Sequence, residues 1–165
     1  MGWPRPFKRS WRSRDWRPNL RACAVHQPQL CAALVLSAFA KIWKGEPQVA
    51  IERLKRAFRL SPVDPDLPWW HAVLAHAYFH SEDYNRAVSA ALAALTNSER
   101  PEALRILAAS YGHAGQTEEA LAAVSRLRKA DPVLRLSTLR QTLGPYRETG
   151  FQRYYEGLRL AGLPE

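Results

Sequence analysis

Apolar residues recur along this chain at the spacing of an amphipathic helix, in which positions i, i+3, i+4 and i+7 share one face. The clearest stripe consists of Leu104, Leu107, Ala108 and Tyr111. A second stripe of helical spacing consists of Ala50, Leu54, Ala57 and Phe58. No segment has the pattern of a strand. The sequence therefore predicts an all-α fold.

Three segments repeat this helical pattern, and each is predicted to form two antiparallel helices joined by a turn. They span residues 31–64, 68–101 and 101–134. Aligned on the turn, all three carry alanine at their eighth and twentieth positions. These alanines are Ala38, Ala50, Ala75, Ala87, Ala108 and Ala120. Because a leucine at such a contact would overpack it at a cost of about 1–3 kcal/mol, we expect these alanines between paired helices.

Glycine and proline mark the ends of the predicted helices. Gly45 and Gly115 fall in the turns of the first and third units, where glycine accommodates a positive φ. Pro62 and Pro132 follow the second helices of the same units, because proline ends a helix that it cannot continue. Residues 135–165 are predicted to form a C-terminal helical cap, since a repeat array exposes an apolar flank at its end.

The three units resemble the tetratricopeptide repeat, a helical pair of about 34 residues with small residues at positions eight and twenty. Tyr78 and Tyr111 also match this repeat, at the eleventh position. The sequence departs from the repeat at Lys41, Glu82, Glu99 and Leu127. The resemblance implies a right-handed α-α superhelix of three hairpins over residues 30–134, followed by the capping helix.

Two further stretches resemble a narrower family. The segment RLSPVDPD, which ends the first unit, and the final FQRYYEGLRLAGLPE are similar to the repeat region of bacterial class III adenylate/guanylate cyclase-type proteins. Catalysis in that family needs two metal-binding aspartates in a βαββαβ domain, which residues 1–29 are too short to hold. The resemblance therefore implies a stand-alone version or remnant of a cyclase-associated signalling region, without the catalytic domain. The alternative is a fragment of such an enzyme whose catalytic domain is encoded elsewhere.

The positive charge is concentrated at the N-terminus. The chain has 24 basic and 15 acidic residues, a net charge of +9, and residues 1–21 hold seven of the bases and one acid. Residues 1–29 are rich in Arg, Pro and Trp without helical periodicity, and we expect a disordered basic arm. Two other interpretations are open: a segment that did not evolve as protein, and an arm that binds nucleic acid or an anionic membrane.

The location is predicted to be cytoplasmic. Two cysteines, Cys23 and Cys31, cannot build a disulfide framework in a chain of this length. No stretch approaches the ~20 apolar residues that cross a bilayer. The apolar run of residues 30–40 after basic residues resembles a secretory signal, but the leader before it is too long and too rich in proline.

No arrangement of residues predicts catalysis. The sequence contains no nucleophile elbow, phosphate loop or Ser-His-Asp order. His76 and His80 have the i, i+4 spacing of zinc ligands, but no third ligand accompanies them. We therefore expect no enzyme activity, no cofactor and no metal.

The resemblance to tetratricopeptide repeats also implies a concave groove, lined by fixed positions on the first helix of each unit. The candidate partner-binding residues are Val35, Phe39, Ile42, Trp43, Trp69, His76, Phe79, His80, Arg105 and His113. Aromatic and arginine side chains dominate binding hot spots. The predicted function is a non-catalytic protein–protein interaction module that binds a protein or peptide segment. Packing of these residues against a neighbouring repeat or the cap is the alternative for each, and self-association of the chain is also open.

Overall fold

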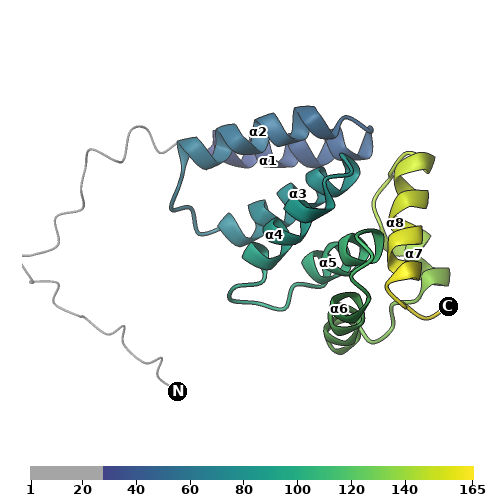
Figure 1. Cartoon of the computed structure of the whole chain (residues 1–165). Helices are drawn as coiled ribbons and strands as arrows, with labels where there is room; N and C mark the ends of the chain where they lie inside the picture. Colours follow the sequence, from purple (N-terminus) through teal and green to yellow (C-terminus); the bar gives the residue numbers. More distant parts are fainter. Residues whose placement is uncertain (1–27) are drawn as a thin grey trace, which may run out of the picture.

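The computed structural model describes residues 28–165, and this part of the chain is entirely helical, without strands (Figure 1). The prediction of an all-α fold is therefore confirmed for the described residues. Most of the predicted basic arm and Cys23 lie outside them. None of the helices in this range is long and apolar enough to cross a bilayer.

Six helices form three consecutive hairpins. Their bounds are α1 Pro28–Trp43, α2 Pro47–Leu60, α3 Leu67–His80, α4 Tyr84–Ala94, α5 Pro101–His113 and α6 Thr117–Ala130. Helix α1 packs on α2, α3 on α4 and α5 on α6, while α3 also contacts α1 and α5 (Figure 1). The first helices of the hairpins are therefore neighbours, with α3 between the other two.

Local sequence signals set where these helices begin. Helices α2, α3 and α5 each have a proline in the first two positions, where a backbone N–H has no partner within the helix. In α4 the Asp83 side chain caps the helix by accepting from the Arg86 N–H at 3.2 Å.

The three hairpin turns use the same left-handed backbone conformation. Gly45 and Gly115 have φ of +74° and +71°, and Glu82 takes the equivalent place in the middle hairpin with φ of +65°. A residue other than glycine in this region is strained. Glu82, where the sequence departs from the repeat pattern, also makes an ion pair with Arg153 at 2.7 Å.

The core runs along the contacts within and between the hairpins. All six repeat alanines are at most 1% exposed, so their small side chains lie where the helices meet. Pro62 and Pro132 follow the last residues of α2 and α6, at Leu60 and Ala130.

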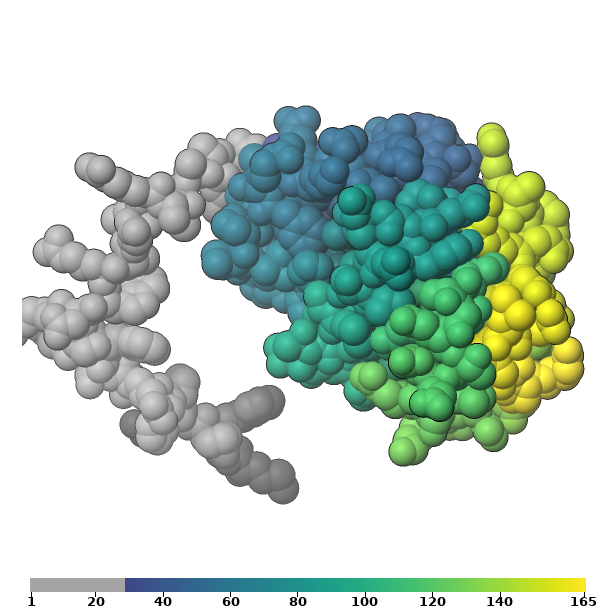
Figure 2. All heavy atoms as spheres, in the orientation of Figure 1, coloured from purple at the N-terminus to yellow at the C-terminus, as the bar shows by residue number. Residues whose placement is uncertain are grey.

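The C-terminal segment folds back onto the hairpins. It contains a 3-10 turn, Leu136–Thr138, then α7, Leu139–Thr142, and α8, Glu148–Leu160. Helix α8 packs mainly on α5, and the chain end is held where the Leu136 N–H donates to the Pro164 carbonyl at 2.9 Å. Figure 2 shows this yellow segment packed directly against the hairpins.

Candidate functional site

The structure brings most of the predicted groove residues together on α1, α3 and α5. Phe39 contacts Trp43 and His76, with ring centroids 4.8 and 5.8 Å apart. Phe79 contacts His80 and His113 at 5.2 and 5.6 Å. These two groups of aromatic rings lie on the first helices of the hairpins and are joined by the Tyr154 ring, which contacts His76 and Phe79; we call them the groove face.

The predicted groove residues differ in how much of them is accessible. Val35, Ile42, His76, Phe79 and His80 are buried. Phe39, Trp43, Trp69, Arg105 and His113 are half-buried. Trp69 has no ring contact with the groove face among the described residues, and Val35 belongs to the apolar core.

Two tyrosines of the C-terminal segment cover the groove face. The Tyr154 side chain is 0% exposed, and its ring lies 5.4 Å from Phe79 and 5.6 Å from His76. The Tyr146 ring stacks on His80 at 4.9 Å, and its hydroxyl lies 3.2 Å from His76 Nδ1, within hydrogen-bond distance. The residues predicted to hold a partner therefore hold the chain's own C-terminal segment.

Polar contacts tie the same segment to all three hairpins. The Arg147 N–H donates to the Trp43 carbonyl, at the end of α1, over 3.1 Å. Arg153 donates to the His80 carbonyl at 3.3 Å and pairs with Glu82 at 2.7 Å, both at the end of α3. His113 Nε2 on α5 lies 2.8 Å from the Arg153 carbonyl.

Glycines allow the segment to approach closely. A Cβ at Gly157 would lie 2.8 Å from the Ala109 carbonyl oxygen, and one at Gly112 would lie 2.3 Å from the Gly157 carbonyl oxygen. Helices α5 and α8 therefore touch backbone to backbone. A Cβ at Gly144 would lie 2.5 Å from the Trp43 indole nitrogen. Real Cβ atoms do not come this close, so larger residues here would push the segment off the groove face.

Four buried ionisable groups of this contact, those of His76, His80, Tyr146 and Tyr154, are held in their neutral forms. Burial lowers the pKa of His76 and of His80 to about 3, and the positive charges of Arg105 and Arg153 respectively add to the shift. Burial raises the pKa of Tyr154 to about 12, against the opposing effect of Arg105. The pKa of Tyr146 also rises because of burial.

Two polar atoms of this contact are buried without a hydrogen-bond partner among the described residues. They are His80 Nε2 and Arg105 Nε. Trp43 hydrogen-bonds with Tyr146, and Arg105 with the Tyr154 hydroxyl. An unsatisfied buried group costs about 1–3 kcal/mol, so the C-terminal segment fills the groove face without satisfying all of its polar atoms.

The groove face consists of aromatic rings, imidazoles and one guanidinium, which are side chains that stack and hydrogen-bond. Among residues 28–165, no group of three or more His, Cys, Asp or Glu side chains could hold a metal ion.

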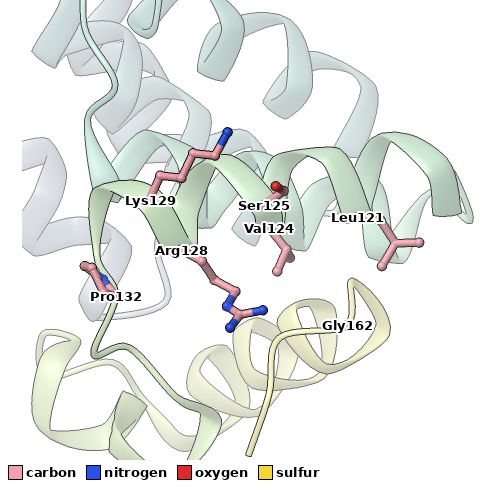
Figure 3. A pocket seen from close by; sticks show the side chains of 7 residues that line it. All are labelled: Leu121, Val124, Ser125, Arg128, Lys129, Pro132 and Gly162. Carbon is pink, nitrogen blue, oxygen red and sulfur yellow. The ribbon is translucent and has the colours of Figure 1, made fainter.

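A second, shallow hollow lies on α6 beside the C-terminal turn. Figure 3 shows Leu121, Val124 and Arg128 pointing toward the turn at Gly162, while Lys129 points away from it. None of the lining residues carries a buried, unpaired polar side-chain atom among those of residues 28–165.

The sequence analysis did not identify Tyr146, Gly112, Gly144 or Gly157 as parts of the site. A glycine inside a predicted helix is a signal of close approach, and both Gly112 and Gly157 are such residues. The sequence alone does not indicate which other helix packs closely against these glycines. In comparisons with protein-family models and with curated proteins, nothing matches this chain.

Proposed function

We propose that this protein is a non-catalytic interaction module of the tetratricopeptide type, whose groove face binds a helical segment of another polypeptide. In this proposal the three hairpins form a right-handed superhelix, and the first helices line its concave side. The shared alanine contacts and the left-handed turns of the three hairpins support this arrangement. The sequence resemblance supports a cytoplasmic role in bacteria, beside signalling enzymes of the cyclase type.

The observation that carries the proposal is the seating of α8. A helix lies on the groove face with a fully buried tyrosine anchor, Tyr154, between Phe79 and the histidines of α3. Recognition of an amphipathic helix in an apolar groove rests on such anchors. A face that binds one helix through side-chain pockets has the chemistry to bind another.

Selection of peptides from a displayed random library against the purified full chain tests this function. We expect selected peptides to bind wild-type protein and to lose at least about tenfold in affinity for Phe39→Ala, because Phe39 joins Trp43 to His76 on the groove face. Leu36→Ala is the matched control, since Leu36 is also on α1 but is 60% exposed. Equal binding to Phe39→Ala and wild type, or a library that yields no peptide, would overturn the proposal.

A further inference from the structure

The segment of residues 144–160 occupies the groove face as a ligand would. It begins at the end of α1, where Gly144 lies under the Trp43 indole, and passes the end of α3 through Tyr146. It then runs along α5, where Gly157 meets the Ala109 carbonyl. A single short stretch thus contacts the first helix of every hairpin.

The fit of this segment is incomplete. Arg105 Nε can only donate a hydrogen bond, and it is buried without an acceptor among the described residues. His80 Nε2 is also buried without a partner in this range. A built-in ligand that leaves such groups unpaired is held less tightly than its buried apolar contacts alone would hold it.

The segment can also leave without opening a hairpin. It follows α6 through residues 131–143, in which Pro132 and Val133 are exposed while Leu136 and Leu139 are buried. Its main helix contact is the one between α8 and α5. The contacts inside the three hairpins involve none of its residues.

We propose that residues 144–160 are a displaceable intramolecular ligand, which competes for the groove face with a partner helix of the same chemistry. This inference rests on the proposed function and names the partner that the groove fits. That partner presents one aromatic side chain just before its helix and another within it, as Tyr146 and Tyr154 do here. It also carries a glycine at the position of Gly157, because the backbone of α5 leaves no room for a Cβ there. Partner binding therefore requires release of the C-terminal segment.

A fluorescent synthetic peptide of residues 144–165, titrated into the full chain, tests this competition. Gly157→Ala places a Cβ 2.8 Å from the Ala109 carbonyl oxygen and loosens the chain's own segment. Gly150→Ala is the matched control in the same helix, since its Cβ would meet the His80 ring at an ordinary 3.5 Å. We expect the peptide to bind Gly157→Ala at least about tenfold more tightly than wild type or Gly150→Ala, because more of the groove is open.

Two additional measurements make the test decisive. Arg153→Ala removes the contacts to Glu82 and to the His80 carbonyl, and it should also raise the affinity for the peptide. If Gly157→Ala does not fold, this second variant tests the competition. A peptide with alanine in place of Tyr154 should not bind any of these proteins, because it lacks the anchor. Equal binding of the wild-type peptide to all variants would overturn the proposal.

Other results separate this inference from the proposed function. Library-selected peptides that bind wild type and Gly157→Ala equally would overturn the competition while leaving the groove's function intact. A library that yields no peptide would overturn the proposed function even where the 144–165 peptide binds Gly157→Ala. If light scattering shows a dimer that depends on protein concentration, a second copy of this chain would be the occupant of the groove face. That result would overturn the partner proposed above.

Discussion

The contacts inside the hairpins and the contact between the hairpins and α8 are both buried, but they are built from different side chains. Inside the hairpins, alanines let helices approach, and the buried Ser110 hydroxyl is satisfied by the Ile106 carbonyl at 2.6 Å. Beneath α8, histidines and tyrosines are buried, and His80 Nε2 and Arg105 Nε have no hydrogen-bond partner among the described residues. The first kind of contact contributes stability, whereas the second selects what lies on the groove face at a cost in stability.

The largest expected effect comes from removing the anchor of the second contact. Tyr154→Ala should weaken the docking of α8 by about 3–5 kcal/mol, as for other large aromatic side chains removed from a core. The hairpins should remain folded, because their contacts do not involve Tyr154. Hydrogen exchange should show α8 amides losing protection while those of α3 and α4 keep theirs.

Tyr154→Phe is the companion to that variant, because it keeps the ring and removes only the hydroxyl. We expect it to weaken the docking of α8 far less than Tyr154→Ala does, because the buried ring is the larger part of the anchor. A loss as large as that of Tyr154→Ala would mean that the hydroxyl, and not the ring, is the larger part of the anchor.

Overpacking a contact inside a hairpin should destabilise the hairpins rather than the docking of α8. Ala108→Leu adds volume at a position that is 0% exposed, and should lower the free energy of unfolding of the whole chain by about 1–3 kcal/mol. Urea denaturation followed by circular dichroism measures this loss. Ala32→Leu is the control, because Ala32 is exposed on α1. Similar stability for the two variants would contradict the packing role of the repeat alanines.

Acid should weaken the contact of α8 more than the hairpins. His76 and His80 have pKa values near 3 when buried, below the ~6.5 of an exposed imidazole, so the detached state takes up protons first as the pH falls. The stability of this contact is present above pH ~6.5 and is lost toward pH 3. Linkage gives a loss of about 2 kcal/mol between pH 6.5 and 5.5 for the two groups.

Exchange of α8 amides, measured across this pH range at constant ionic strength, reports that loss. His80→Phe should keep a ring under Tyr146 and remove about half of the dependence, since only His76 would then titrate. Protection of α8 that is constant from pH 7 to 5 would show that the histidines are not buried by the segment.

The smallest expected effect concerns the turn of the middle hairpin. Glu82→Gly relieves a left-handed φ of +65° and removes the ion pair with Arg153, in which the Glu82 side chain is 63% exposed. The first change should stabilise the turn and the second should loosen α8, each by less than about 1 kcal/mol. Thermal unfolding together with α8 exchange separates the two, and a lower melting temperature without faster exchange would contradict this account.

The helices could be predicted from the sequence because their signals are local. The helical stripe from Leu104 to Tyr111 lies in α5, and the prolines and glycines mark the ends of helices within a few residues. The first helix begins at Pro28, inside the stretch expected to be a disordered arm of residues 1–29. Such boundaries depend on tertiary packing as well as on composition.

The position of α8 could not be predicted in the same way. The apolar pattern around Phe151, Tyr154 and Leu158 indicates a helix with one buried face, but it does not say which surface covers that face. Contacts such as Tyr146 with His76 join residues far apart in the chain, and only the folded structure brings them together. The sequence therefore singled out residues such as His76 and Phe79 but not the tyrosine that packs on them.

Hydrogen exchange of the full-length wild-type protein at neutral pH tests the central claim most directly. If residues 144–160 are a displaceable ligand of the groove face, amides of α8 should exchange through a local opening, faster than those of α3 and α5. Their exchange should also be insensitive to Ala108→Leu. Exchange of α8 only through global unfolding, at the same free energy as α3, would show that α8 is a permanent part of the core and would contradict the account.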